Sequence, residues 1–206
     1  SLGYQIQINT NRASTTFTHK LKYSIGALSG TIANGVGDTY TWTLPVSLAS
    51  AIKTSKSGVL KIICETYSGA TLVGTKEISI TVGVPDNETF RPDPSITSII
   101  EAATGLSAFT VFIQGKSKLK VDVAATGKYG ATITQYQVEI DGSSYYGQSI
   151  TSPVINKSGT IPIKLTVTDS RGYSDSVTQN VTVESYQPPK ILGFAANRAP
   201  TDQGTD

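Results

Sequence analysis

The sequence of 206 residues contains no methionine and only one cysteine, one tryptophan and one histidine. It has no run of 18 apolar residues, the minimum for a transmembrane helix, and we expect no signal peptide in it. The single cysteine, Cys64, excludes an intrachain disulfide, so packing alone must hold the fold together. Because the chain starts Ser1-Leu2-Gly3 and contains no methionine, we expect it to be a segment of a longer polypeptide, with a processed N-terminus as the alternative.

Charge is sparse and balanced. Charged residues make up 16% of the sequence, and 17 basic against 15 acidic groups leave a net charge of +2. Such a balance produces no field that would attract nucleic acid or an anionic membrane. We therefore expect partners that are neither nucleic acid nor a membrane into which the chain inserts.

The known catalytic and metal-binding signatures are also missing. There is no nucleophile elbow, no His-Glu-x-x-His, no phosphate-binding loop and no Cys-x-x-Cys. His19 and Cys64 have no evident third group to orient them as a catalytic pair. The segment Asp202–Asp206 has oxygen ligands four residues apart but lacks the further acidic residues of a calcium loop, which favours a turn. We expect a protein that is not an enzyme, with no catalytic residues, no cofactor and no metal site, and the sequence assigns no ligand-binding residues.

What the sequence does contain is β-strand patterning. In the segment 161–183, Ile161, Ile163, Leu165 and Val167 alternate with polar residues, which is typical of a half-buried strand. Asp169-Ser170-Arg171-Gly172 then supplies turn chemistry, and a second alternating run follows it. The segment is therefore predicted to be a β-hairpin that closes an antiparallel sandwich.

The same hairpin pattern occurs earlier, at residues 59–82. Gly58 and Gly159 introduce the two hairpins at a spacing of about 100 residues, the usual length of one sandwich domain. The sequence thus predicts an all-β fold of tandem immunoglobulin-like antiparallel β-sandwiches. Cys64 lies in the earlier hairpin and is expected to be a small buried apolar residue. The expected organisation is a first sandwich at 1–86, a stiff proline-rich linker at 87–94, a second sandwich at 95–187, and the truncated start of a third repeat at 188–206.

The remaining expected elements follow from the same period-of-two rule. A turn is expected at 34–38, and one or two helical turns are expected at 45–52, where Val46, Ala49 and Ile52 recur near helical spacing. Further strands are expected at 4–8, 16–25, 28–32, 39–44, 95–100, 116–123 and 132–141.

Two single residues have both a functional and a structural interpretation. His19 lies on the apolar face of its strand and is either a ligand or base, or a hydrogen-bonded residue at the edge of the core, which we favour because no second ligand accompanies it. Trp42 either stacks on a sugar or anchors the core, and the core is favoured in so small a β domain.

Two groups of residues also have alternative interpretations. Lys116, Lys118 and Lys120 form either a phosphate-binding stripe or a solvated strand face that guards a sheet edge; the face is favoured because no aromatic residues interleave with the lysines. Tyr145 and Tyr146 are the best candidates for contact with a sugar, although one inward and one outward ring of a strand explains them equally well.

Three blocks of the first half resemble a known family. FTHKLKYSIGALSGTIANGV, DTYTWTLPVSLASAI and GVLKIICETYSGATLVGTKEISITVGVP, within residues 15–85, are similar to minor structural proteins of siphophages that infect Gram-positive bacteria. ILGFAANRAPTDQGTD near the C-terminus resembles another segment of that family, with Ala199 after Arg198 where the family often has cysteine. Residues 95–186 resemble only a generic immunoglobulin-like or PKD-like repeat.

The resemblance implies a virion component, associated with the tail or the particle surface, that spaces or attaches the particle toward its host. It implies other virion proteins as partners, a host cell-surface glycan as a further candidate partner, and no enzyme activity. The alternative hypothesis is a bacterial surface or secreted protein that uses the sandwiches as a stalk or as sugar-binding accessory modules. A small hydrolase has almost no support from the sequence.

Overall fold

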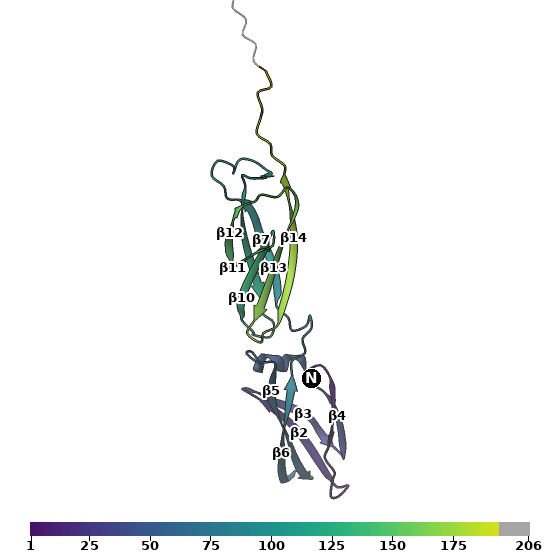
Figure 1. Ribbon diagram of the computed structural model, residues 1–206. Coiled ribbons are helices and arrows are strands. Elements are labelled where there is room, and N and C mark those ends of the chain that lie inside the picture. The colour runs from purple at the N-terminus through teal and green to yellow at the C-terminus, as the bar shows by residue number, and fades with distance from the viewer. Residues whose placement is uncertain (194–206) are drawn as a thin grey trace, which may run out of the picture.

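The computed structural model describes residues 1–193, which form two β-sandwiches arranged end to end (Figure 1). In the first, a four-stranded antiparallel sheet of order β3-β2-β5-β6 packs against the two-stranded sheet β1-β4, and a 3-10 helix η1 lies at one end. The elements are β1 (Gln5–Asn9), β2 (Phe17–Ile25), β3 (Leu28–Val36), β4 (Thr39–Thr43), η1 (Val46–Ala51), β5 (Ser57–Ser68) and β6 (Thr71–Gly83).

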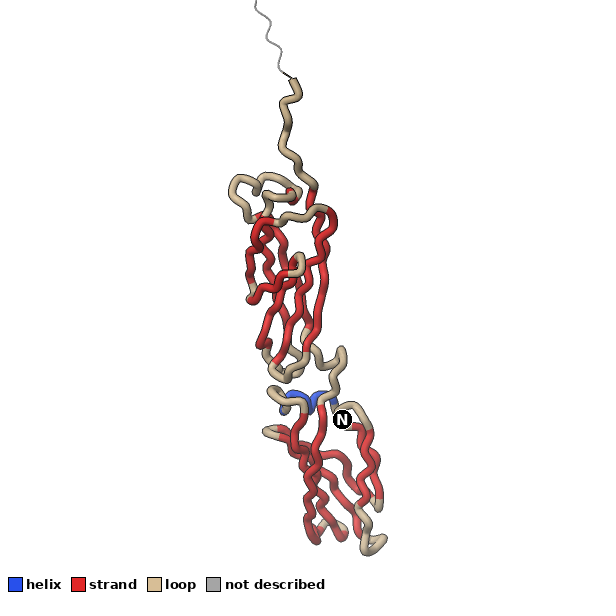
Figure 2. The backbone as a smooth tube through the Cα atoms, viewed as in Figure 1, coloured by secondary structure: helices blue, strands red, loops and turns tan. Residues whose placement is uncertain are grey.

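The second sandwich has one more strand in each sheet. Its larger sheet has the order β11-β10-β13-β14-β8, and its smaller sheet has the order β12-β9-β7. The elements are β7 (Asp93–Glu101), β8 (Phe112–Ile113), β9 (Lys118–Thr126), β10 (Ile133–Ile140), β11 (Ser143–Tyr146), β12 (Ser149–Val154), β13 (Gly159–Asp169) and β14 (Ser174–Glu184). The chain is thus an all-β protein of tandem immunoglobulin-like antiparallel sandwiches (Figure 2), as its alternating pattern predicts.

The two closing hairpins are β5-β6 and β13-β14, and they form as predicted. In β13 the buried residues are Ile161, Ile163, Leu165, Val167 and Asp169, which alternate with less buried positions. Each sandwich has its own apolar cluster, with Leu21, Leu60 and Trp42 in the first and Leu119, Val138 and Leu165 in the second. The period of two is therefore sufficient to place most of the core.

Several strands differ from the prediction. β3 continues to Val36 and includes most of the turn cluster expected at 34–38, because irregularities in its register with β2 absorb the extra residues. β8 and β12 are not predicted by the sequence pattern. β12 contains Pro153 and a break in register with β9, which disturb its alternation.

The segment predicted to be a stiff extended linker at 87–94 is folded instead. Backbone N–H groups of Phe90 and Arg91 both donate to the Asn87 carbonyl, at 3.0 and 2.9 Å, which makes a turn. Phe90 is only 1% exposed and belongs to the first apolar cluster, and β7 already begins at Asp93. The prediction of a polyproline-like spacer is wrong because burial of the Phe90 ring outweighs the local preference of the prolines for extended backbone.

Beyond β14 the described chain continues as an extended segment to residue 193, with Ile191 and Leu192 92% and 94% exposed. The remainder of the predicted third repeat, including the turn expected at Asp202–Asp206, lies outside the described residues. Within residues 1–193, no helix has the length and apolar character needed to cross a membrane.

Trp42 provides a test of the packing in the first sandwich. Its side chain is buried, and its ring lies 5.4 Å from that of Tyr23, measured between centroids. We expect Trp42→Ala to lower the free energy of unfolding by about 3–5 kcal/mol, since it empties an aromatic core site. Chemical denaturation measures the change, and Tyr146→Ala, which alters an exposed ring, is the matched control with an expected effect within about 0.5 kcal/mol. Tryptophan fluorescence in the folded protein identical to that of the free amino acid would contradict a buried Trp42.

Candidate functional site: the junction between the two sandwiches

The tip of the β13-β14 hairpin is a tightly bonded turn that faces the first sandwich (Figure 1). Asp169 Oδ1 accepts hydrogen bonds from the backbone N–H groups of Arg171 and Tyr173, both at 2.9 Å. Gly172 takes a φ of +80°, which glycine adopts without the strain that a side chain would cause. The aspartate therefore fixes the direction in which Arg171 and Tyr173 leave the turn.

The guanidinium of Arg171 is completely buried and joins the two sandwiches. Toward the first sandwich it donates from Nε to the Ile52 carbonyl at 2.7 Å and from Nη2 to the Ala49 carbonyl at 3.1 Å. Toward its own sandwich it donates to the carbonyls of Lys128 and Tyr129, at 3.0 and 3.2 Å. Burial of a cation is unfavourable unless its donors are satisfied, and this geometry satisfies them with carbonyls from both sides.

The two carbonyls in the first sandwich come from the end of η1. Ala49 lies in η1 and Ile52 caps its C-terminus. The last carbonyls of a helix carry partial negative charge and can accept further hydrogen bonds; here the Ala49 carbonyl already accepts the Ile52 N–H at 2.9 Å and uses its second lone pair for Arg171. Arg171 supplies both the hydrogen-bond donors and the positive charge, so the predicted helical turns at 45–52 have a structural purpose as the receptor for this side chain.

Asp169 also provides a buried counter-charge for the arginine. The distance from Arg171 Nη1 to Asp169 Oδ2 is 3.6 Å, and both side chains are fully buried. Removal of one partner from such a pair leaves an uncompensated charge in the interior. The two residues therefore depend on each other, although Asp169 makes its own hydrogen bonds only within the turn.

Tyr173 forms a second contact across the junction. It is 3% exposed, and its hydroxyl donates to the carbonyl of Val84, the residue that follows β6. Burial raises the pKa of Tyr173, and the negative charge of Asp86 raises it further, so the hydroxyl keeps the proton that it donates. The Lys56 ammonium lies 5.3 Å from the centre of the same ring, within range of a cation–π interaction.

Apolar packing completes the junction. The rings of Phe90, from the segment between the sandwiches, and Tyr129, from the second sandwich, lie 5.3 Å apart. Tyr173 and Tyr129 both pack with the apolar cluster of the first sandwich, and the Ser170 hydroxyl donates to the Lys53 carbonyl at 2.5 Å. The junction is thus packed like a protein interior, which opposes bending between the sandwiches.

Sequence reasoning interpreted Arg171 only as part of a turn and did not identify the junction. One signal was available. The corresponding tip of the first hairpin, Ser68–Thr71, carries only small residues, whereas the second tip displays Arg171 and Tyr173. Long side chains at one of two otherwise equivalent tips indicate a contact that the other tip lacks.

His19 and Cys64 line the same groove in the first sandwich, yet they do not form a catalytic pair. His19 is 5% exposed, and its Nδ1 lies 3.0 Å from Thr66 Oγ1. Burial raises the pKa of the Cys64 thiol, and the nearby charge of Glu65 raises it further. An activated cysteine requires the opposite shift, so the thiol stays protonated and poorly nucleophilic.

The structure places neither the three lysines nor the two tyrosines together as a binding site. Lys116 and Lys118 are exposed, while Lys120 lies 3.5 Å from Asp122. β9 lies between β12 and β7, so the expectation that these lysines guard a sheet edge is wrong.

Tyr145 is partly buried against the second apolar cluster and Tyr146 is 64% exposed, which places one ring on each face of β11.

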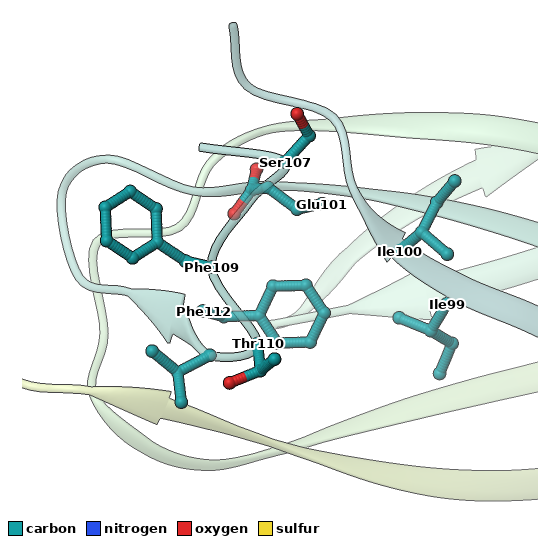
Figure 3. Close-up of a pocket in the computed structure, with 8 residues that line it drawn as sticks. Ile99, Ile100, Glu101, Ser107, Phe109, Thr110 and Phe112 are labelled. Carbon is teal, nitrogen blue, oxygen red and sulfur yellow. The ribbon is translucent and has the colours of Figure 1, made fainter. Parts of the chain in front are cut away.

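A further pocket lies at the end of the second sandwich that is remote from the junction. It has a volume of about 340 Å³, and its lining includes Ile99, Ile100, Phe109 and Phe112 (Figure 3). Its carboxylate, Glu101, accepts backbone N–H groups of Ala103 and Lys118. Burial acts to raise the pKa of Glu101, but the Ser117 hydroxyl and backbone donors outweigh it and lower the pKa. The carboxylate therefore holds the adjoining loop in place.

Across residues 1–193, no group of three or more His, Cys, Asp or Glu side chains is arranged to hold a metal ion. The features described so far define a class of protein: tandem immunoglobulin-like sandwiches joined through a buried, hydrogen-bonded arginine.

The chain belongs to a bacteriophage family. Residues 1–205 match the family model described as siphovirus protein of unknown function (DUF859). The resemblance to siphophage proteins noted in the sequence is therefore confirmed at the level of the virus group, over nearly the whole chain. A comparison with curated proteins gives no match.

Solved structures that resemble the chain are also built of β-sandwich modules. The fibronectin(III)-like modules of CbhA from Clostridium thermocellum share 13% identity, with 94% of this chain and 93% of that chain covered and a TM-score of 0.41. A structure of Dpr11 IG1 bound to DIP-gamma IG+IG2 shares 12% identity, with coverage of 90% and 92% and a TM-score of 0.38. Likeness at this level carries no argument about function.

Arg171 provides the test of the junction. We expect Arg171→Ala to destabilise the protein by about 3–5 kcal/mol, since it leaves the Ile52 and Tyr129 carbonyls without their donor and Asp169 without its counter-charge. Chemical denaturation measures the change. Arg91→Ala is the matched control, because Arg91 pairs with Asp86 at the surface and its loss is expected to change stability by about 0–1 kcal/mol. Equal stability of the two variants would show that the buried arginine does not hold the junction.

Proposed function

We propose that this siphovirus protein is a non-enzymatic structural component of the virion, on the tail or the particle surface, that acts as a spacer or as part of the host-adhesion apparatus. The observation that carries the proposal is the junction at Arg171, because a spacer must keep its length and direction. Membership of the siphovirus family supports a phage origin and is the reason to prefer a virion role over the stalk of a bacterial surface protein.

The geometry of the junction suits a part that transmits force. A flexible tether would place an exposed, polar linker between the domains. Here the connecting segment is folded, Phe90 is buried, and Arg171 and Tyr173 bond to backbone carbonyls of the first sandwich. Bending would expose a buried cation and break these hydrogen bonds together, so the two sandwiches resist it as one body.

We further propose that the partners are other virion proteins, with a Gram-positive host as the target of the particle. A host cell-surface glycan is a second candidate partner, and the exposed ring of Tyr146 is one place where a sugar could stack. The spacer role is favoured over direct adhesion. Within residues 1–193, the larger of the two described pockets is lined mainly by apolar side chains. Backbone N–H groups hold one oxygen of its only carboxylate, Glu101, and the other oxygen is buried without a hydrogen bond, so the pocket offers few polar groups to orient a sugar.

A rigid spacer predicts an elongated particle in solution. A globule of 187 residues would have a radius of gyration of about 16 Å. A strand of 11 residues is about 36 Å long, which sets the length of each domain. Two such domains placed end to end have a combined radius of gyration of about 22 Å. Small-angle scattering on residues 1–187 distinguishes the two values. A radius near that of the globule, with the sandwiches side by side, would remove the basis for the spacer role.

The virion location is tested separately on purified particles. We expect an antibody raised against this segment to label intact siphophage virions, with labels clustered at the tail or on the particle surface under the electron microscope. Particles in which the protein is deleted provide the control for specificity. If the protein is abundant in infected cells but absent from purified particles, the structural role is wrong.

A further inference from the structure

The two sandwiches share a framework that allows position-by-position comparison. Gly58 pairs with Val82 in the first closing hairpin, and Gly159 pairs with Val183 in the second. The segments that lead into β1 and β9 make equivalent hydrogen bonds to the ends of these hairpins. The N–H of Leu2 donates to the carbonyl of Gly83, and the N–H of Gln114 donates to the carbonyl of Glu184.

The next residue of each segment also makes an equivalent hydrogen bond, here to the chain that leaves β4 or β12. The N–H of Gly3 donates to the Leu44 carbonyl, and the N–H of Gly115 donates to the Ile155 carbonyl. These matching bonds place β1 and β4 of the first sandwich where β9 and β12 lie in the second. In this correspondence Ile8 takes the place of Val121, as their pairings with β4 and β12 show. Thr10 takes the place of Val123, since their N–H groups donate in the same way to the carbonyls of Asp38 and Gln148.

Two strands of the second sandwich, β7 and β8, have no counterpart in the described part of the first, and the smaller sheet lacks the equivalent of β7. β7 pairs with β9 on the edge away from β12 and also lies against β13 and β14. In the first sandwich, the matching edge of β1 carries no strand among residues 1–193. A groove of about 180 Å³ opens there between β1, β5 and β6, and Ile78 on its wall is 52% exposed.

The lining of the groove matches what β7 fills in the second sandwich. Ile96 of β7 lies opposite Val123 and Ile99 lies opposite Val121, with a register shift between them, so the two inward side chains are three residues apart. The equivalent positions opposite them in the first sandwich, Thr10 and Ile8, both line the groove. A strand of the β7 type would therefore place two apolar side chains into it.

The groove also contains a polar atom that lacks a partner. His19 lines it, and Nε2 of this buried side chain makes no hydrogen bond. A buried nitrogen without a partner is unfavourable, whereas an added strand brings backbone N–H and C=O groups to this edge. The unpaired nitrogen and the exposed Ile78 both line this groove, so a further segment there would find a polar and an apolar contact.

The chain itself contains a segment of the β7 type. Pro189, Ile191 and Phe194 repeat the spacing of Pro94, Ile96 and Ile99 in the sequence. Ile191 is 92% exposed in an extended stretch that leaves the far end of the second sandwich. Figure 1 shows this stretch at the opposite end of the molecule from the first sandwich, so a chain cannot insert its own segment into its own groove.

We propose that the open edge of β1 accepts residues 188–194 of a second copy of this chain as an added antiparallel strand. The direction is consistent with end-to-end stacking: β1 runs from the junction toward the free end of the first sandwich, so an antiparallel strand enters at that free end. Residues 188–194 of the next copy would enter at that end, just as β7 enters the second sandwich at its junction end. Copies joined in this way lie head to tail, and such contacts extend the array instead of closing it.

Sedimentation velocity over about a hundredfold range of concentration tests the association. We expect the full chain to form oligomers as concentration rises and Ile191→Asp to abolish them. Leu192→Asp is the matched control, since Leu192 is 94% exposed but corresponds to Thr97, an exposed position of β7. It is expected to associate like the unaltered chain. A monomer at every concentration, or equal loss in both variants, would overturn the proposal.

A peptide assay tests the groove independently of the virion role. The acceptor is the full Ile191→Asp chain, whose donor segment is disabled, and the probe is a fluorescent peptide of residues 187–199. We expect Ile78→Asp in the acceptor to weaken binding about tenfold or more, since it places a charge on the apolar wall. Val59→Asp, on an exposed residue of β5 outside the groove, is expected to leave binding unchanged. Absence of peptide binding, or equal weakening by both changes, would refute the docking site.

Discussion

The structure depends on one buried cation. The guanidinium of Arg171 is enclosed between the sandwiches, where its desolvation would be strongly unfavourable without the carbonyls of Ala49 and Ile52 on one side and those of Lys128 and Tyr129 on the other. Only one relative orientation of the sandwiches brings all four acceptors to the same side chain. Electrostatics therefore specifies the angle of the junction, while the apolar packing around Phe90 and Tyr173 supplies much of its stability.

The same contact explains the role of two local structures that are unremarkable by themselves. η1 is a short 3-10 helix with no side-chain cap, yet its last carbonyls are the receptor for the arginine. The turn at Asp169 is an ordinary hairpin tip, yet its hydrogen bonds aim the arginine at that receptor. Each structure supplies what the other lacks, the turn a directed cation and η1 its acceptors, and together they join the two domains.

The two sandwiches share a framework, but the smaller sheet of the second has an additional strand that the first lacks among the described residues. The second has β7 along β9, and its inner face is closed by Ile96 and Ile99. The first has an open edge at β1, and the groove behind it is lined by apolar residues such as Ile62 and Ile78 together with the buried His19. For a family of phage proteins, an open strand edge and an unpaired strand-like tail on one chain are suited to assembly, because both are satisfied only when a further segment is added.

The sequence by itself determined the fold class, the two closing hairpins and most core positions. Each of these follows from local alternation, in which neighbouring residues report directly on which face of a strand is buried. Through the blocks in residues 15–85 it also indicated a siphophage protein, which the family match bears out at the level of the virus group. Only the tertiary structure decided that the proline-rich segment folds around Phe90, that β12 pairs despite Pro153, and that Arg171 enters the first sandwich. These outcomes depend on contacts between residues far apart in the chain, about 120 positions for Arg171 and Ala49, and local periodicity contains no information about such distant partners.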